Sequence, residues 1–203
     1  MNATKPLIVP ALLPLGGGSK PPPRTEPTGE NARVRRPKAQ SMTTAHDFSF
    51  AKLDEPGEIK LADYAGKAIL VVNVASACGF TPQYRDLEQL YEAKTAKGLV
   101  VIGLPCNDFG AQESGSERDI RGFCDAQYHV KFPMTAKVEI VSPAKRHPFY
   151  AWVARELGDA ALPRWNFHKF LIGKDGRLVE GFSSKAGPLG PQMLGAIEKT
   201  LAA

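Results

Sequence analysis

The sequence is poor in cysteine and has no CxxC pair. Only three cysteines occur among 203 residues, and the four histidines are not spaced from them as metal ligands would be. An odd number of widely separated thiols excludes a disulfide-stapled scaffold and indicates a reducing compartment, so we expect the protein in the cytoplasm. The spacing predicts no structural zinc site, and we expect no bound metal or cofactor.

Long apolar runs are also lacking. The longest, residues 7–15, has nine residues and contains Pro10 and Pro14. A membrane-spanning helix needs roughly 20 consecutive apolar residues, so the sequence predicts no membrane span. With 43% hydrophobic and 23% charged residues, the chain has the composition of an ordinary globular protein.

An excess of positive charge is absent from most of the chain. Residues 1–41 hold seven basic and two acidic residues, whereas residues 42–203 hold 19 of each. The net charge of +5 therefore belongs to the N-terminal segment alone. We expect no basic face on the folded part and no nucleic-acid partner.

The N-terminal segment lacks aromatic residues and carries eight of the 17 prolines, together with Gly and Pro runs. It cannot bury enough apolar surface to offset its ordering entropy. We therefore predict a disordered basic tail over residues 1–44 and one folded domain over 45–203. Three interpretations of the tail are open: translation that begins at Met42, which we favour, a targeting segment, or a linker.

What the sequence does contain is a cysteine between a predicted strand and a predicted helix. Residues 68–74 are apolar and β-branched, which indicates a strand buried on both faces. Thr81 is the expected N-cap, and Pro82 the first residue, of a helix over 82–96. Cys78 would then face free amide groups and the positive end of the helix dipole, which favour a reactive thiolate. A buried structural cysteine is the alternative interpretation.

The order of the other predicted elements indicates the fold. A hairpin pairs residues 48–50 with 59–61, and a strand over 99–104 completes a right-handed βαβ unit. Beyond it we expect a helix, an extended segment, a helix, a hairpin and a last helix, at 117–127, 132–140, 147–157, 167–172 with 178–182, and 191–201. Ser116 should cap the first of these helices, with Cys124 and Gln127 on its apolar face. This order predicts an α/β protein, a thioredoxin-like three-layer sandwich with a central mixed sheet and an N-terminal β-hairpin.

Three short segments combine residues that carry chemistry. They read NVASACGFT at 73–81, LPCNDFGAQE at 104–113 and RWNFHKF at 164–170. Together, and in this order, they resemble the signature blocks of glutathione peroxidases. The resemblance extends from about residue 47 to the C-terminus. Three matching blocks are far more specific than any one of them.

The resemblance implies roles for four residues. Cys78 matches the family's peroxidatic cysteine or selenocysteine, and the residues around it match Gln112, Trp165 and Asn166. Their N–H groups would stabilise a thiolate and the charge that develops on peroxide oxygens. The thiolate would attack the terminal peroxide oxygen and become a sulfenic acid. Taken singly, the tryptophan would more often be a core anchor, the glutamine a loop residue and the asparagine the start of a strand.

The resemblance also implies how the sulfenic acid is reduced. In one branch of the family a Phe-Cys pair precedes a Phe-Pro pair, as residues 123–124 and 132–133 do here, and that cysteine is the resolving thiol. Cys124 lies 46 positions after Cys78 on a predicted helix, which would have to unwind to bring the two sulfurs together. Its alternative interpretation is a packed helical residue.

Other positions refine these expectations. Cys106 follows a buried strand and is interpreted as an inert buried thiol. Ala77 and Asp108 stand where the family more often has Lys and Gln, and a carboxylate at 108 would oppose thiolate formation if it pointed inward. Segment 144–165 lacks the insertion that tetrameric, glutathione-preferring members use for subunit contacts, and no cluster of basic residues for glutathione is evident. The resemblance thus implies a monomer with an open site.

We therefore predict a cytoplasmic thiol peroxidase that reduces hydrogen peroxide and organic hydroperoxides to water or alcohols. Its reducing co-substrate would be thioredoxin, acting through Cys124, or glutathione. A redox sensor that passes oxidation from Cys78 to a partner protein would use the same residues and is the alternative.

Overall fold

The computed structural model describes residues 43–203. The predicted disordered tail and the proposed start at Met42 therefore lie outside the described residues, except for Thr43 and Thr44. No helix within the described range is both long and apolar enough to cross a bilayer.

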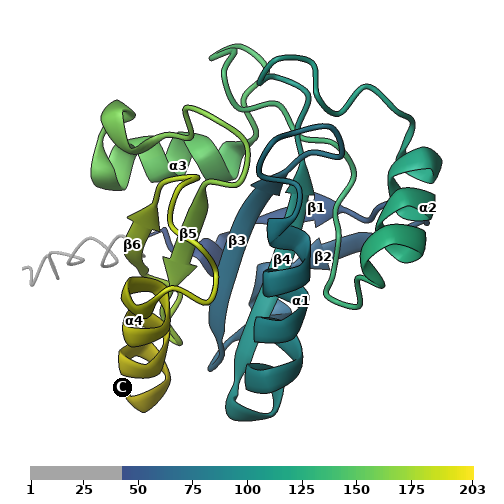
Figure 1. The fold of residues 1–203 in the computed structure, drawn as a ribbon. Helices are drawn as coiled ribbons and strands as arrows, with labels where there is room; N and C mark the ends of the chain where they lie inside the picture. Colours follow the sequence, from purple (N-terminus) through teal and green to yellow (C-terminus); the bar gives the residue numbers. More distant parts are fainter. Residues whose placement is uncertain (1–42) are drawn as a thin grey trace, which may run out of the picture. The chain divides into compact units, whose positions relative to one another are not determined.

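A four-stranded mixed sheet lies at the centre (Figure 1). Its strands are β3 (Ala68–Val74), β4 (Leu99–Pro105), β5 (Lys169–Ile172) and β6 (Leu178–Phe182), in the spatial order β4-β3-β5-β6. β3 is parallel to β4 and antiparallel to β5, which pairs antiparallel with β6. Every residue of β3 and β4 is buried, as unbroken apolar runs predict. The predicted mixed sheet and its βαβ unit are confirmed.

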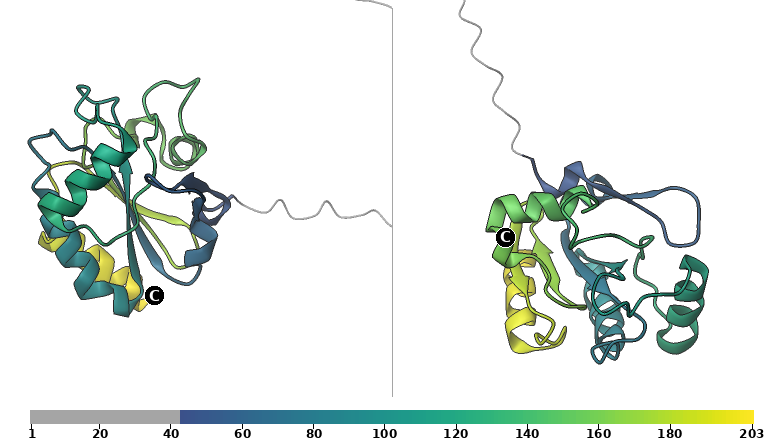
Figure 2. Two further views of the ribbon diagram at one scale, coloured as in Figure 1. Left: turned by 90° about the vertical axis from the view of Figure 1, so that its right-hand side faces the viewer. Right: turned by 90° about the horizontal axis from the view of Figure 1, so that it is seen from above.

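Other elements cover both faces of this sheet (Figure 2). The helices are α1 (Gln83–Lys94), α2 (Glu117–Tyr128), α3 (Pro148–Leu157) and α4 (Pro191–Ala202), with short 3-10 helices at Ala45–Asp47, Leu61–Tyr64, Thr95–Lys97 and Asp159–Ala161. Successive strand residues point to opposite faces, so Leu70 and Val72 pack with α1, α2 and α4, whereas Ile69 and Val71 pack with α3. On the α3 side lies the hairpin of β1 (Ser49–Ala51) and β2 (Glu58–Lys60). The predicted three-layer sandwich is confirmed.

The start of α1 differs from the prediction. The helix begins at Gln83, with Pro82 as its N-cap residue, and no side chain caps it. Thr81 instead accepts a hydrogen bond from the Cys78 amide at 2.9 Å and donates one to the Ala75 carbonyl at 2.9 Å. The predicted Thr81 cap is therefore wrong, because the hydroxyl serves the turn that precedes the helix.

The N-terminal end of α2 is capped as predicted. Ser116 Oγ accepts from the Asp119 amide at 3.3 Å, and the Asp119 carboxylate accepts from the Ser116 amide at 2.9 Å. Cys124 is fully buried on the inner face of the helix, but Gln127 is exposed, so its predicted burial is wrong. The apolar face of α2 instead continues to Tyr128, whose ring centroid lies 5.3 Å from that of Tyr84.

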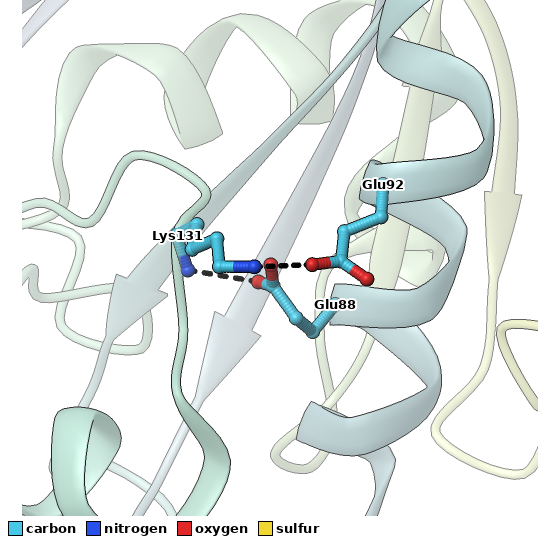
Figure 3. Close-up of polar contacts among 3 residues, drawn as sticks. All are labelled: Glu88, Glu92 and Lys131. Atoms are coloured by element: carbon cyan, nitrogen blue, oxygen red, sulfur yellow. Dashed lines mark hydrogen bonds and ion pairs between the residues drawn. The ribbon is translucent and has the colours of Figure 1, made fainter.

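The chain after α2 is fixed to α1. His129 ends the helix in the left-handed region, with φ 52°. The Lys131 amide then donates to Glu88 Oε2 at 2.8 Å, and the Lys131 ammonium pairs with Glu92 (Figure 3). The segment 132–140, predicted to be extended, forms no strand, and within it only Met134 and Thr135 form isolated bridges. Residue 131 is thus a fixed point at the end of α2.

Candidate active site

Cys78 lies in the turn between β3 and α1. Its carbonyl accepts from the Thr81 amide at 2.9 Å, which closes the turn. The Phe80 amide donates to Cys78 Sγ at 3.4 Å, and the residue is 8% exposed. A backbone N–H directed at sulfur stabilises negative charge there. The predicted position of the thiol, facing an amide at the start of a helix, is therefore present.

Gln112 and Asn166 form a hydrogen-bonded pair beside this turn. The Ala77 amide donates to the Gln112 carbonyl at 3.1 Å, which joins the loop of residue 112 to the cysteine turn. Asn166 Nδ2 donates to Gln112 Oε1 at 2.9 Å and to the Phe109 carbonyl at 3.3 Å. Because Oε1 is occupied as an acceptor, the Gln112 NH₂ group is left to donate elsewhere. Asn166 itself is fully buried.

Trp165 is the exposed member of the predicted set. The residue is 40% exposed, which is not how a core anchor is placed. Its ring packs against Phe109, with centroids 6.4 Å apart. A Cβ at Gly110 would make an ordinary contact with the indole Cη2 at 3.4 Å, but the positive φ of +69° at this position favours glycine.

Asn73, at the end of β3, positions Trp165 and Asn166. Its Nδ2 donates to the Trp165 carbonyl at 3.1 Å and its Oδ1 accepts from the His168 amide at 3.1 Å. Its own carbonyl accepts from the Phe167 amide at 2.6 Å, where the backbone has φ 62°. We assigned Asn73 no role from sequence, although one polar residue in an apolar strand was the available signal.

Cys124 and Cys106 are both buried thiols. Burial raises the pKa of Cys124 to about 11 and that of Cys106 to about 12. Neither is in a disulfide, and both are 0% exposed. Cys124 lies in the same apolar cluster as Cys78, and it packs against α1 from α2. Cys124 is therefore a protonated thiol while α2 is packed.

The Asp108 carboxylate serves a neighbouring loop. Its Oδ2 accepts from the Ile140 and Val141 amides at 2.6 and 2.8 Å. Its hydrogen bonds therefore tie down residues 140–141. Asp108, which stands where the family more often has Gln, thus holds a neighbouring loop in this chain.

Two buried charged residues near the site were not singled out from sequence. Glu113 is 1% exposed, and its Oε1 accepts from the Ser76 hydroxyl at 2.8 Å. Lys169 is 0% exposed, and its ammonium donates to Gln83 Oε1 and to the Ala186 carbonyl. Burial raises the pKa of Glu113 and lowers that of Lys169 to about 7. Charged residues are usually exposed, so no sequence signal predicted their burial.

The arrangement offers sulfur and hydrogen-bond donors rather than metal ligands. Within residues 43–203, no three His, Cys, Asp or Glu side chains are grouped so as to hold a metal ion. The site can present a nucleophilic sulfur with N–H groups close by.

Known proteins resemble this chain over most of its length. A family model for glutathione peroxidase matches residues 45–154. A hydroperoxy fatty acid reductase of Synechocystis sp. is 39% identical over 171 residues, which cover 80% of this chain and 99% of the relative. Glutathione peroxidase-like peroxiredoxin 2 of Saccharomyces cerevisiae is 43% identical over 152 residues, 72% of this chain and 92% of the relative.

Solved structures resemble the fold as well. The crystal structure of Trgpx in its apo form has a TM-score of 0.62 and 34% identity, and covers 79% of this chain and 97% of its own. T. cruzi GPX1 has a TM-score of 0.60 at 27% identity and covers 79% and 98%. A thiol:disulfide interchange protein from Chlorobium tepidum, 17% identical with a TM-score of 0.58, covers 78% and 96% and shares the thioredoxin-like fold.

Proposed function

The chain belongs to the glutathione peroxidase family and is a thiol peroxidase, and we propose that Cys78 is the nucleophile with which it reduces hydroperoxides. The Sγ thiolate attacks the terminal oxygen of the hydroperoxide and the O–O bond breaks. The alkoxide takes up a proton and leaves as an alcohol, or as water when the substrate is hydrogen peroxide. Sulfur is oxidised to a sulfenic acid while the peroxide is reduced.

One observation carries this proposal. The Phe80 amide donates to Cys78 Sγ, and the hydrogen-bonded pair of Gln112 and Asn166 is joined to the same turn through the Gln112 carbonyl. Since Asn166 occupies Gln112 Oε1, the Gln112 amide nitrogen and the exposed Trp165 indole are N–H donors available to the peroxide oxygens. Donors that are already in place stabilise charge in the transition state without reorganisation.

The substrates we propose are hydrogen peroxide and organic hydroperoxides. One relative is named a hydroperoxy fatty acid reductase, which supports lipid hydroperoxides as a class. The exposed Trp165 face beside Phe109 is an apolar surface on which an alkyl chain could pack. We also propose that the protein is a monomer and that it acts in the cytoplasm.

For the second half of the cycle we propose Cys124 as the resolving thiol. Its attack on the Cys78 sulfenic acid forms a disulfide and releases water, and thioredoxin then reduces the disulfide. The burial of Cys124 means that α2 must open first. Glutathione is the alternative reductant, which would reduce the sulfenic acid without Cys124.

Coupled turnover with each reductant tests these assignments. We expect hydroperoxide consumption with thioredoxin, its loss in Cys78→Ser, and in Cys124→Ser a sulfenic acid that forms after one equivalent of peroxide but is not turned over. Full activity of Cys78→Ser would reject the nucleophile. Unchanged thioredoxin turnover by Cys124→Ser would reject only the resolving role. Slow turnover together with a trapped mixed disulfide to another protein would favour the redox relay.

A further inference from the structure

The helix that carries Cys124 is held to the rest of the protein by few side chains. Of the 12 residues of α2, only Ile120 and Cys124 are buried, whereas α1, α3 and α4 each bury three or four. Arg121 Nη2 adds a hydrogen bond to the Leu53 carbonyl at 3.2 Å. Elements with few buried contacts are those that open most readily while the rest of a protein stays folded. The packing of α2 thus favours its local opening.

Gly122 lies in the interior of this helix, two residues before Cys124. Its position is exposed, and its φ is not positive. Apart from its own helix, a Cβ built there would meet no atom within 4 Å. By contrast, a Cβ at Gly103 of β4 would clash with Met134. Neither packing nor backbone conformation therefore requires a glycine at position 122.

A glycine inside a helix weakens that helix. Glycine gains more backbone freedom than any other residue when the helix unwinds. At an exposed interior position it makes the helical state about fivefold less favourable than alanine does. Since nothing in the packing offsets this cost, Gly122 raises the fraction of molecules in which α2 is open.

The chain is tied down on both sides of α2, which limits the part that opens. Before the helix, the Lys137 ammonium donates to the Gly115 carbonyl at 2.6 Å. After it, the Lys131 amide donates to Glu88 Oε2 at 2.8 Å. Residues 116–130 can therefore unwind while both flanking points stay in place. Gly122 lies near the middle of this segment, where loss of helix affects the turns on either side.

We propose that Gly122 sets the rate of the resolving step by keeping α2 easy to unwind. The Cys124 thiol is fully buried, so it reaches the Cys78 sulfenic acid only from the opened helix. When opening and closing are fast, the rate of disulfide formation is proportional to the population of the open form. The glycine thereby shortens the time for which Cys78 remains a sulfenic acid and is open to further oxidation. This inference rests on the proposed two-cysteine cycle.

The test is the rate of disulfide formation after one equivalent of hydrogen peroxide, measured by quenched alkylation and mass spectrometry. In Gly122→Ala it should be about fivefold slower than in wild type, while sulfenic acid formation is unchanged. Hydrogen exchange of the amides of residues 117–128 should slow by the same factor. Gly122→Ser should slow the disulfide only about twofold, because serine has an intermediate helix propensity. A steric effect would reverse this order, since serine is larger than alanine.

Gly195 of α4 provides a matched control. It is also an exposed glycine inside a helix, and a Cβ there would likewise meet no atom of another element within 4 Å. Gly195→Ala should slow hydrogen exchange in α4 and leave the rate of disulfide formation at its wild-type value. Equal slowing of the disulfide in both alanine variants would show dependence on overall stability and would overturn the inference. A wild-type rate in Gly122→Ala would overturn it as well.

The role of Gly122 and the two-cysteine cycle fail in different ways. Hydrogen exchange needs no peroxide, so unchanged exchange of α2 in Gly122→Ala would overturn the role of the glycine whatever happens to the cycle. Failure of the cycle is read separately, from a wild-type protein that forms no disulfide after peroxide and from unchanged thioredoxin turnover in Cys124→Ser.

Discussion

Asn166 Nδ2 donates to Gln112 Oε1 at 2.9 Å, and this contact decides which way the Gln112 amide points. With its oxygen engaged by a fully buried neighbour, Gln112 can offer only its NH₂ group to a substrate. The orientation of a donor is thus set by a residue that contacts no solvent.

Replacement of Gln112 by Glu tests the donor directly. Glu keeps the shape and can accept from Asn166, but it offers no N–H and adds a negative charge beside Cys78. We expect the second-order rate constant with hydrogen peroxide to fall about 100-fold, the scale of a lost preorganised donor. Stopped-flow kinetics of sulfenic acid formation would measure it. A rate within twofold of wild type would show that Gln112 has no part in the peroxide step.

The Asn73 side chain should carry a measurable share of stability. Asn73→Leu would leave the Trp165 carbonyl and the His168 amide without their partners. Leaving two such groups unpaired costs about 2–6 kcal/mol. Urea denaturation should show this loss, and peroxide reactivity should fall with it because Trp165 and Asn166 lose their anchor. A change in unfolding free energy below about 0.5 kcal/mol, within the range of neutral surface substitutions, would contradict the role.

Lys169 should make stability depend on pH. Burial lowers the folded-state pKa to about 7, whereas an unfolded lysine has about 10.4. Between these values the unfolded state binds a proton that the folded state does not, so the unfolding free energy should rise from pH 7 toward pH 10. Lys169→Met should remove that rise. Urea denaturation of both proteins at pH 7 and 9 would measure the change in unfolding free energy with pH. An equal change in wild type and Lys169→Met would reject the buried amine as its cause.

Alkylation of the reduced protein should rank the three thiols. Cys78 has partial exposure and an amide on its sulfur, whereas Cys124 and Cys106 are fully buried with pKa values of about 11 and 12. At pH 8 only about one Cys124 in 10³ is ionised. Iodoacetamide should therefore modify Cys78 first, as peptide mass spectrometry would show. Faster modification of Cys124 would mean that α2 is open at rest.

Loss of the α2 cap should speed the resolving step. Ser116→Ala removes a capping interaction worth about 1 kcal/mol, which makes opening of the helix about fivefold more favourable. Disulfide formation after peroxide should accelerate by up to about that factor, while sulfenic acid formation stays unchanged. Slower disulfide formation would indicate that Cys124 reacts from the folded helix.

The sequence predicted the strand and the motif residues of the site better than the hydrogen bonds and buried charges around them. The apolar run of β3 and the motif positions of glutamine, tryptophan and asparagine predicted a site at Cys78, and the structure joins Gln112 and Asn166 to that cysteine turn. The predicted Thr81 cap was wrong because a hydroxyl at this place can accept from an amide of the helix or from an amide of the preceding turn. Only the folded turn, in which the Cys78 amide donates to it, decides between them. The burial of Glu113 and Lys169 could not be predicted, since it depends on elements distant in the chain closing over them.

The attachment of Lys131 to α1 limits how far Cys124 can move when α2 opens. Cys124 is seven residues before this fixed point, and an extended chain of that length spans at most about 25 Å. While Glu88 and Glu92 hold Lys131, the opened segment is a short tether rather than a free chain. Its thiol therefore samples a small volume that corresponds to an effective concentration in the millimolar range. Such a local concentration lets the intramolecular disulfide form ahead of reaction with dilute external thiols.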